Sequence, residues 1–553
     1  MGGERAWRAL VMASGHALAI LQAMSLPPFT IANILLAAAP LLLVLYLMIG
    51  RNWGGSKAGP AGWIAAALIA VVAFGADGEL LVVAFGRGLL LALYVLYIIW
   101  MALLLYHVVN EAGAIAVLGR ELPQLAPDRA GQALLLAWVF GSFLQGASGF
   151  GVPAAVVAPL LVGLRFPPNV AVAVALLGHG WAVSFGSLGS SYLALIAATG
   201  LPGETMASES ALFLAVACLG CGLGVLLTAG GLQALRKRWF FLVVVGLIMG
   251  AVQWVLAVAG LWTLAALGAG LAGLAAAAVL LRTGAQSARR HRAAAAQTAV
   301  RQTEAPHVAL DLRLLGQAFV PYALLVLVIM LGQLVFAAPL DAVELNLNFP
   351  AVETAFGWRT AEGPGRSISL FGHAGALLLY ASAMTFVWFR RRGTLLAVKT
   401  RYEAAPIVRK TARGSVKSTI SIIALVAMAL TMQHAGMTQL LAVTLSENTG
   451  ALFPLLSPFI GALGAFVTGS NTNSNVIFGQ LQQQTALALG VSVPVIVAAQ
   501  TAGGAIGSMF APAKVVVGVS TVAGADDGKV LRLATAYGVG LLLLLGVLTR
   551  VAG

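Results

Sequence analysis

The sequence has few charged residues and almost no cysteine. Only 9% of its 553 residues are Asp, Glu, Lys or Arg, whereas a soluble globular domain carries about 25%. Because so few charges cannot cover a surface that faces water, most of the surface must face lipid. The two cysteines, Cys218 and Cys221, form C-L-G-C in an apolar run. With no second ligand pair nearby, we expect small buried residues, and a redox or metal site is the weaker alternative.

The common motifs of several enzyme classes are also missing. There is no Walker A pattern for a nucleotide, no H-E-x-x-H and no Asp-rich motif for a metal diphosphate. His179 and His434 have no partners at the spacing of helical metal ligands. We therefore expect a protein without enzyme activity, catalytic residues, metal or cofactor. A polytopic membrane enzyme is the alternative from a different class.

Long apolar runs make up much of the chain. Each is long enough, or nearly so, to cross a hydrocarbon core about 30 Å thick. Because lipid cannot satisfy backbone N–H and C=O groups, these runs are expected to be helices, and they lack the alternation of an outer-membrane barrel. The clearest runs are 31–49, 88–106, 239–258, 261–281, 315–338 and 533–549. We predict an all-α polytopic membrane protein with about 12 transmembrane helices, several of them interrupted.

Two shorter features near the beginning of the chain are less clear. No convincing cleavable signal peptide is present, and the modestly apolar stretch 6–24 is either a first span or an interfacial helix. Asp77, Glu79 and Arg87 are expected in a loop between two spans. Glu111 is expected to cap the end of the helix predicted over 88–106.

The net charge of +14 lies mainly in three basic clusters between apolar runs. These clusters occupy 236–238, 282–313 and 390–417. Two predicted spans separate each cluster from the next, with 368–389 as one of the second pair, so all three lie on one side. The positive-inside rule makes that side cytoplasmic. The charge therefore indicates orientation in a lipid bilayer and not nucleic-acid binding. The longest polar loop, 339–367, should lie on the outer side.

Two sequence landmarks recur in the two halves of the chain. Residues 141–146 read G-S-F-L-Q-G and residues 464–469 read G-A-F-V-T-G, so both fit G-x-F-[LV]-x-G at an offset of 323. Further on, His179 and Gln500 each stand seven residues before a Gly-Ser pair. Transporters are often built from two structural repeats with broken helices at corresponding places. The matched landmarks therefore favour an internal repeat.

The repeat divides the chain into three parts. Residues 1–235 are predicted to form an N-terminal membrane repeat, and residues 315–553 a C-terminal membrane repeat. Residues 236–314 would connect them as a helix pair followed by a basic cytoplasmic linker. We expect the two repeats to be inverted relative to each other, with broken helices or re-entrant hairpins in both.

Each half has a polar or glycine-rich segment between apolar stretches, Q-G-A-S-G-F-G-V-P at 145–153 and T-G-S-N-T-N-S-N at 468–475. Such sequence at membrane depth is tolerated where it is buried or lines a cavity, and half-helix N-termini there suit an anion. The alternatives are helix packing for the first segment and an aqueous loop for the second. The candidate substrate-binding residues are Gln145, Gly146, Ala147, Ser148, His179, Ser187, Thr468, Gly469, Ser470, Asn471, Thr472, Asn473, Gln500, Ser508 and Lys514.

Backbone N–H groups near 146–148 and 469–471, with Lys514 nearby, would hold a carboxylate. A lysine inside an apolar run is costly unless it has a partner or a function. Lys514 is therefore expected to balance the substrate charge, with snorkelling to an interface as the alternative. His179 is either a hydrogen-bonded core histidine or a ligand or proton carrier, because both of its forms are accessible near neutral pH.

The same segments resemble the bacterial L-lactate permease family. The resemblance covers nearly the whole chain and implies a multi-pass transporter of the bacterial cytoplasmic (inner) membrane that takes up lactate or glycolate with protons. It also implies the architecture of the wider ion-transporter group, in which one repeat-built unit moves against another. The matching pieces are 140–156, 160–168 and 183–189 in the first half, and 451–475, 478–482 and 501–509 in the second.

The sequence departs from this family at three positions. Relatives usually carry an acidic residue where Gln145 and Asn471 stand, and a neutral residue where Lys514 stands. The predicted site is therefore more positive than in the family. We expect secondary transport of a short monocarboxylate, most readily L-lactate or glycolate, with H⁺ as the coupling ion and Na⁺ as the alternative. Transport of another anion, a dicarboxylate or a sulphur-containing acid, is the competing hypothesis, and a homo-oligomer is left open.

Overall fold

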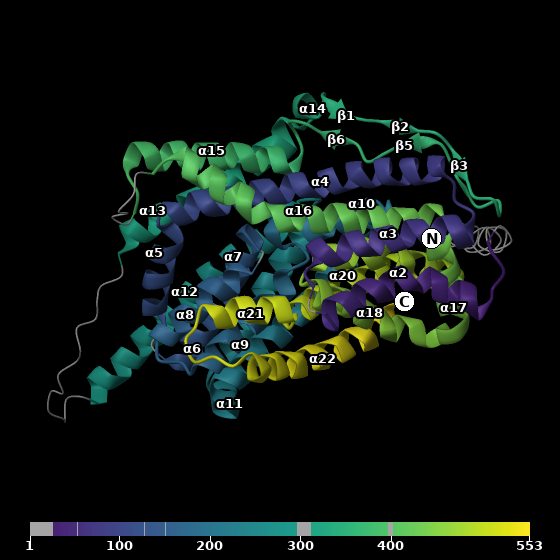
Figure 1. Ribbon diagram of the computed structural model, residues 1–553. Helices are drawn as coiled ribbons and strands as arrows, with labels where there is room; N and C mark the ends of the chain where they lie inside the picture. The colour runs from purple at the N-terminus through teal and green to yellow at the C-terminus, as the bar shows by residue number, and fades with distance from the viewer. Residues whose placement is uncertain (1–25, 52, 127, 150, 296–310, 396–401) are drawn as a thin grey trace, which may run out of the picture.

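The protein is almost entirely helical in its described part (Figure 1). The predicted N-terminal element over 6–24 and most of the predicted basic linker lie outside this part; for 283–295 the backbone alone is described. The computed structural model describes residues 26–51, 53–126, 128–149, 151–295, 311–395 and 402–553.

Eleven described helices are long and apolar enough to cross a membrane, or up to twelve when a bent pair is counted as one span. This confirms the prediction of an all-α polytopic protein with about 12 spans. The bent pair, Pro168–Ala182 and Gly186–Thr199, turns through 51°. The prediction that some helices are interrupted is therefore confirmed as well.

The first half of the chain contains eleven described α-helices and three short 3₁₀ or π segments. They are α2 (Ile31–Ile49), α3 (Gly55–Phe74), α4 (Gly78–Glu111), α5 (Ala114–Glu121), η1 (Leu122–Leu125), α6 (Arg129–Ala133), η2 (Leu134–Phe140), α7 (Gly141–Ala147), α8 (Val152–Gly163), α9 (Pro168–His179), η3 (Gly180–Ala182), α10 (Gly186–Thr199), α11 (Glu204–Val258) and α12 (Trp262–Ala295).

The second half has ten described α-helices and two short segments. They are α13 (Leu312–Met330), η5 (Leu331–Val335), α14 (Ala337–Leu340), α15 (Ala374–Arg392), α16 (Ala404–His434), α17 (Met437–Thr449), η6 (Gly450–Leu452), α18 (Phe453–Thr468), α19 (Asn471–Leu489), α20 (Val493–Met509), α21 (Pro512–Ser520) and α22 (Asp527–Ala552).

All the described strands lie in the loop between α14 and α15. They form three antiparallel pairs of two residues each, which give a narrow ribbon that lies along α4 (Figure 1). The pairs are β1 (Glu344–Leu345) with β6 (Ile368–Ser369), β2 (Asn348–Phe349) with β5 (Gly363–Pro364), and β3 (Val352–Glu353) with β4 (Arg359–Thr360).

The prediction of a loop between two spans is confirmed for Asp77 and wrong for Glu79 and Arg87. Asp77 lies in the short connection between α3 and α4 as the N-cap of α4, and its carboxylate accepts the backbone N–H of Leu80 at 2.8 Å. Glu79 and Arg87 therefore lie inside the helix. The helix can hold Arg87 because its guanidinium donates a hydrogen bond at 3.0 Å to the carbonyl of Ala361 in the ribbon loop.

Two other predicted boundaries also shift. The helix expected over 88–106 continues to Glu111, which belongs to its last turn and forms an ion pair with Lys410 of α16. The span expected over 368–389 begins only at Ala374, because Ile368–Ser369 pairs with β1 as a strand. Both differences arise from contacts with distant segments, which a local hydropathy pattern does not contain.

Helix α11 folds back on itself at Gly230–Gly231, where the backbone angles are not helical. Its two arms run antiparallel, since the indole N–H of Trp254 donates to the hydroxyl of Ser208 at 3.3 Å. Just beyond the turn, Arg238 forms an ion pair with Asp128. The turn therefore places a basic cluster at one end of the bundle, on the side that the charge pattern assigns to the cytoplasm.

The same order of helices and breaks occurs twice. In the first half, the span Arg129–Ala147 breaks before α8, which turns back into α9, and α9 breaks before α10. In the second half, α18 breaks before α19, which turns back into α20, and α20 breaks before α21. The matched sequence landmarks lie at corresponding helices of the two sets. The inverted orientation of the repeats and the three-part division of the chain stay predictions.

The two sets meet through corresponding helices. Helix α10 of the first set packs against α19 of the second, and α21 of the second set packs against α8 of the first. In the repeated order, α10 corresponds to α21 and α8 corresponds to α19. The two contacts are therefore equivalent under exchange of the two sets. The four helix breaks are therefore brought toward the middle of the protein, where most of the predicted site residues lie.

Candidate functional site

Six buried, uncharged polar side chains join the two halves where α10 packs against α19 and α20. None has more than 4% of its surface exposed. They come from the break before α10, from α10 itself, and from the first turns of α19 and the middle of α20. We call them the central polar cluster: Ser184, Ser191, Asn471, Thr472, Asn475 and Thr501.

The amide of Asn471 is at the centre of this cluster. Its Nδ2 donates to Ser184 Oγ at 3.1 Å and to the Thr501 carbonyl at 3.2 Å. The hydroxyl of Ser184 in turn donates to the same carbonyl at 2.9 Å, and the Thr501 hydroxyl donates to Ser184 Oγ at 3.1 Å. Asn471 therefore connects the broken segment of the first half to α20 of the second.

A second pair of bonds lies one helical turn further along α19. Asn475 Nδ2 donates to the Ser191 carbonyl and to Thr501 Oγ1, both at 2.9 Å. The hydroxyls of Ser191 and Thr472 are hydrogen-bonded at 3.0 Å. Asn471 and Asn475 are four residues apart, so they share one helix face. The segment 468–475 is thus a buried helix start and not an aqueous loop, as the sequence favoured.

The first half reaches this cluster through a distorted backbone. Ser187, Leu188 and Gly189 adopt φ of 49°, 56° and 76° in succession. Non-glycine residues rarely occupy this left-handed region, which costs of order 1–3 kcal/mol for each and persists only where the surroundings enforce it. Leu188 is fully buried, so packing holds the segment in place. The distortion lies between Ser184, which contacts Asn471 and Thr501, and Ser191, which contacts Thr472 and Asn475.

Residues of the first break pack directly against this distorted segment. Gly149 has φ of 57°, and a Cβ there would run into Ser187 Oγ and Gln145 Nε2. Gln145 also fills the space in front of Gly186. The hydroxyl of Ser187 is 3.5 Å from the Ser148 carbonyl, which it can reach as a donor. The structure therefore brings Gln145, Ser148 and Ser187 together, as the sequence predicted.

The second half forms its break with an ordinary helix cap. Gly469 has φ of 71°, and Ser470 is the N-cap of α19, whose side chain accepts the Asn473 N–H at 3.3 Å. The Thr468 hydroxyl donates to the Gly464 carbonyl at 2.7 Å and also accepts the Ser470 N–H. Two N–H groups near the predicted carboxylate position are therefore already occupied by the chain itself.

Gln500 belongs to a neighbouring set of polar contacts. Its Nε2 donates to Ser474 Oγ at 3.0 Å, and its Oε1 accepts from Gln482 at 2.6 Å. Ser474 donates onward to the Gly461 carbonyl at 2.7 Å. All three polar side chains are fully buried. This set links α18, α19 and α20, so it stabilises the second half and does not cross to the first.

His179 and Lys514 form a third buried group. His179 is fully buried, and its Nδ1 donates to the Ala175 carbonyl at 2.7 Å. Lys514 is 9% exposed, and its Nζ donates to Ser508 Oγ at 3.0 Å. Gly180, next to His179, packs against Met509, next to Ser508, so the lysine and the imidazole lie in the same region of the bundle. Lys514 is therefore held inside the protein by Ser508 and does not extend to an interface.

Three predicted site residues lie apart from these groups. A Cβ on Gly146 would collide with the backbone of Leu267 in α12, so this glycine serves close helix packing. Ala147 ends α7 and is buried without a polar side chain. Asn473 points to α16, where its Nδ2 is 3.4 Å from Ser421 Oγ. The packing alternative thus holds for part of the first segment.

Several polar atoms at these breaks have no hydrogen-bond partner within the described residues. They are the amide oxygens of Gln145, Asn471 and Asn475 and the Nε2 atom of His179. A buried polar atom without a partner costs about 1–3 kcal/mol, so such atoms are rare in folded proteins. These four atoms lie at or next to three of the four helix breaks, so a polar ligand or ion placed there would find them without a protein partner.

Sequence reasoning missed four members of the central polar cluster. Asn475 ends the polar run 468–475 but is not among the candidate residues. Ser184, Ser191 and Thr501 are hydroxyl residues within largely apolar sequence, and each gains a partner from a segment about 280 to 320 residues away. Ser184 and Thr501 do lie inside the motifs that carry the family resemblance. The motifs therefore mark Ser184 and Thr501, but they do not show which residues these two contact.

A second polar cavity opens on the side opposite the basic clusters. We call it the outer cavity; its volume is about 450 Å³. It extends from the ribbon loop to Leu193 of α10, two residues from Ser191 of the central polar cluster. Its polar and charged lining residues are Tyr94, Thr263, Gln333, Asp341, Glu344, Arg366, Ser367, Ser369 and His373.

The outer cavity holds a fixed positive charge and a neutral histidine. The Arg366 guanidinium lies 4.3 Å from the centre of the Tyr94 ring. His373 Nδ1 accepts the Gly375 N–H at 3.2 Å, so the ring proton is on Nε2, which has no partner among the described residues. Burial, reinforced by the charge of Arg366, lowers the pKa of His373 to about 4. The histidine is therefore neutral at ordinary pH.

The described residues contain no group of three or more His, Cys, Asp or Glu side chains that could hold a metal ion. Cys218 and Cys221 are free and fully buried in the first arm of α11, where the sequence placed them. Trp138 donates its indole N–H to the Cys218 carbonyl at 3.0 Å. The pair is thus part of the helix packing.

Comparison with known proteins agrees with this arrangement. The family model described as L-lactate permease matches residues 33–552, which is nearly the whole chain. The chain belongs to the L-lactate permease family. The central polar cluster and all four helix breaks lie within the matched region. The family consists of permeases, and its relatives found here come from bacteria, so this member is a multi-pass protein of the bacterial inner membrane.

Three curated relatives of this family member are similar over most of their length. The L-lactate permease of Bacillus subtilis (strain 168) is 27% identical, over 94% of this chain and 96% of the relative. The L-lactate permease of Escherichia coli (strain K12) is 26% identical, over 77% and 78%. The glycolate permease GlcA of the same strain is also 26% identical, over 87% and 89%.

A solved structure, that of the Alcanivorax borkumensis YdaH transporter, covers 82% of this chain and 84% of its own. Its sequence identity is 15% and its TM-score is 0.43. A TM-score at that level does not establish a shared fold. The assignment of the chain to its family therefore rests on the sequence comparisons.

Proposed function

We propose that this family member is a secondary transporter of a short 2-hydroxymonocarboxylate, with L-lactate and glycolate as the first candidates. The observation that carries the proposal is the central polar cluster, which bridges the two halves at their helix breaks inside a member of the L-lactate permease family. Two curated relatives are named for lactate and one for glycolate. Both acids combine a carboxylate with one hydroxyl group.

The chemistry of the breaks suits such a substrate. The free amide oxygens of Asn471 and Asn475 can accept the substrate hydroxyl, since they lack a donor among the described residues. Lys514, held by Ser508 near His179, supplies a positive charge for the carboxylate. A point charge attracts the carboxylate without fixing a bidentate geometry. The neutral cluster would therefore select the hydroxyl, and Lys514 would attract the anion.

Alternating access would move the two sets of broken helices against each other. The outer cavity supports a route from the outer side, because it reaches α10 two residues from Ser191. Arg366 has no ion-pair partner among the described residues and would attract an anion there, while Asp341 and Glu344 oppose it. The balance of these charges would make this position a passage and not a tight binding site.

For the coupling ion, we propose H⁺ first and Na⁺ second. His179 and Lys514 are titratable groups next to the breaks, and of the two His179 has the ordinary pKa nearer neutral pH for carrying a proton. Na⁺ is favoured by a different observation, the unpartnered amide oxygens of Gln145, Asn471 and Asn475, because carbonyl oxygens at unwound helices are suitable Na⁺ ligands. Coupling to H⁺ would therefore depend on His179, whereas coupling to Na⁺ would depend on Gln145, Asn471 and Asn475.

The test is uptake of labelled L-lactate into liposomes that contain the purified protein. We expect uptake that an inward H⁺ gradient accelerates, and competition by unlabelled glycolate. Acceleration by Na⁺ alone would overturn H⁺ coupling and keep the substrate. A folded protein without lactate or glycolate uptake would overturn the substrate assignment. A panel of dicarboxylates and sulphur-containing acids then tests the competing hypothesis of another anion.

A further inference from the structure

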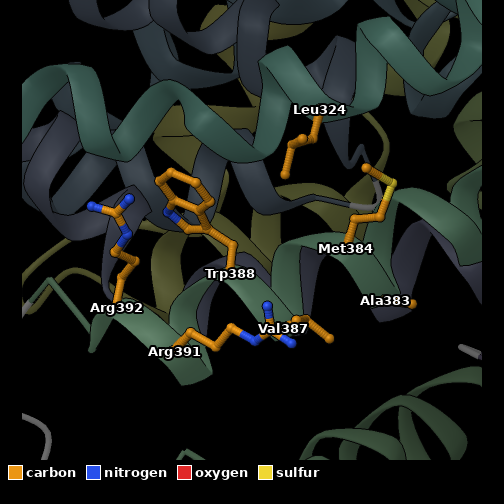
Figure 2. Close-up of a pocket in the computed structure, with 7 residues that line it drawn as sticks. All are labelled: Leu324, Ala383, Met384, Val387, Trp388, Arg391 and Arg392. Atoms are coloured by element: carbon orange, nitrogen blue, oxygen red, sulfur yellow. The ribbon is translucent and has the colours of Figure 1, made fainter.

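An open groove lies between α13 and α15, far from the helix breaks. Its volume is about 540 Å³. Figure 2 shows Leu324 of α13 facing a row of side chains from α15, with Met384 and Ala383 at one end and Trp388 with Arg392 at the other. The complete lining consists of Leu324, Ala383, Met384, Val387, Trp388, Arg391 and Arg392. One end of the groove is thus apolar and the other is cationic.

The row on α15 is a single helix face. Met384, Val387, Trp388 and Arg391 are spaced at three, four and seven residues, so they lie one above another. Met384 and Val387 are 44% and 45% exposed. Because α15 packs against the membrane-spanning helices α4 and α13, this exposed face is at membrane depth. The apolar end of the groove therefore lies against lipid chains.

The cationic end has no acidic partner. None of the three ion pairs between described residues includes Arg391 or Arg392. The guanidinium of Arg392 lies 5.0 Å from the centre of the Trp388 ring, which holds it beside the groove. Arginine binds phosphate oxygens through paired N–H groups more specifically than lysine can. Figure 2 shows the Arg392 guanidinium beside Trp388 at one end of the groove and the Arg391 guanidinium directed back along α15 toward Val387. The two positive charges therefore lie at different places along an apolar groove, which is complementary to a phospholipid that carries net negative charge.

The position of Arg391 and Arg392 at a helix end can also be explained without a bound lipid. Arg390, in the same turn, allows the two explanations to be distinguished. Arginines stabilise a helix C-terminus and reach from the membrane to its interface, whatever lipid is present. Arg390 belongs to the same turn and carries the same charge, but it lies over the Phe386 ring at 5.9 Å and does not line the groove. A general effect of charge would involve Arg390 as much as Arg391, whereas a lipid site would not.

We propose that the groove between α13 and α15 binds one anionic phospholipid of the cytoplasmic leaflet. An acyl chain lies along Leu324, Ala383 and Met384, the phosphate is bound by Arg391, and Arg392 supplies a second positive charge at the Trp388 end. Ala383 and Arg391 are eight residues apart, which is about 12 Å along a helix. The basic cluster at the end of α15 is on the side that the charge pattern places in the cytoplasm, where anionic lipids attract basic residues.

The experiment is native mass spectrometry of the full-length protein in detergent. The protein is titrated with phosphatidylglycerol or with phosphatidylcholine of the same acyl chains. We expect several-fold greater retention of phosphatidylglycerol. One arginine near an anionic lipid surface contributes about 1 kcal/mol, so Arg391→Ala should lower this retention about fivefold. The matched variant Arg390→Ala should leave the preference for phosphatidylglycerol unchanged.

A second variant tests the apolar end of the groove without changing the arginines. Ala383→Trp would fill the apolar end, so it should lower retention of both lipids while leaving the arginines in place. Free inorganic phosphate should not displace the bound lipid, because it lacks the acyl chain. Equal retention of the two lipids by the wild-type protein would overturn the proposal. Equal losses in Arg390→Ala and Arg391→Ala would overturn it as well, and would show a general effect of surface charge.

Discussion

The first half of the chain bends α9 into α10 through left-handed residues that are not glycine, whereas the second half uses a glycine, Gly469, and ordinary helix caps. Ser187 and Leu188 have positive φ without being glycine, and packing must hold them there. Ser470 and Ala511, the N-caps of α19 and α21, have extended backbone angles that any residue adopts. The second set of breaks is therefore encoded locally, and the first set depends on contacts made by the folded protein.

The difference also concerns which half supplies the polar groups. In the second half, one short segment provides Asn471, Thr472 and Asn475 on one helix. In the first half, Ser184 and Ser191 reach the same cluster only because the distorted backbone between them changes direction. The second half thus contributes to the cluster from one regular helix, and the first half from both sides of a distorted backbone segment. Variants in one half, each matched with a control change, test this difference.

The largest effect is expected from Asn471→Ala. The substitution leaves the hydroxyl of Ser184 and the carbonyl of Thr501 without their shared donor. The loss of one partner from a buried hydrogen bond costs about 1–3 kcal/mol. If that cost falls on the transport step, uptake of labelled lactate by proteoliposomes should fall at least about fivefold.

Asn473→Ala is the matched control for this variant. Asn473 has the same chemistry two residues further along α19, but its amide faces Ser421 outside the central polar cluster. It should retain most of the wild-type uptake, because every contact of the central polar cluster stays in place. Equal losses in the two variants would contradict the central role of the cluster.

The next effect compares two glycines, Gly149 and Gly469. Both have positive φ, 57° and 71°, so alanine adds a similar backbone strain of about 1–2 kcal/mol at each. The added methyl group at 149 would also collide with Ser187 and Gln145, whereas at 469 its nearest neighbour is the Ala513 Cβ at 3.2 Å. Gly149→Ala should therefore lower the thermal unfolding temperature more. Equal shifts would show that the first set of breaks is no more dependent on packing than the second.

A smaller effect is expected from Ser470→Ala. The variant removes the side-chain cap of α19, which should lower the free energy of unfolding by about 1 kcal/mol. Ser148→Ala is the corresponding change in the first half. Ser148 donates only to the Leu144 carbonyl within its own turn, and α8 has no side-chain cap to lose. Denaturation in detergent should therefore show a smaller loss for Ser148→Ala, and the reverse order would contradict a capped second break.

The smallest effect lies outside both sets of breaks, at His373. Its pKa of about 4 is below the ordinary value of 6.5, so the unfolded chain binds a proton between these values while the folded protein does not. The stability that depends on neutral His373 is complete above pH 6.5 and is lost as the pH falls toward 4. His373→Gln should reduce this acid sensitivity in thermal unfolding, and an unchanged pH profile would exclude the histidine as its source.

Much of the fold followed from the sequence because it depends on local patterns. Apolar length predicted the spans, and the G-x-F-[LV]-x-G motif marked the corresponding helices of the two halves. The polar run at 468–475 was correctly interpreted as a buried helix break. Its cap at Ser470 is also a local feature, because it requires only the N–H of a residue three positions further on.

The remaining features depend on distant contacts. Arg87 could be assigned to a helix only with knowledge of the carbonyl of Ala361, 274 residues away. The roles of Ser184 and Thr501 likewise depend on partners from the other half of the chain. Gly146 looked like part of a ligand site, yet its neighbour is the α12 backbone. A single sequence gives the type of each residue, but it does not give the partner across the bundle.

The central polar cluster contains no ionisable side chain, and this has an electrical consequence. Asn471 and Asn475 offer amides, so a carboxylate that crosses there with no accompanying cation moves one negative charge through the membrane field. Each elementary charge involves about 2.3 kcal/mol of work per 100 mV. With a negative interior, that work opposes entry and favours exit. The voltage dependence of flux therefore measures directly whether a cation travels with each substrate molecule, and in which direction the protein works in a living cell.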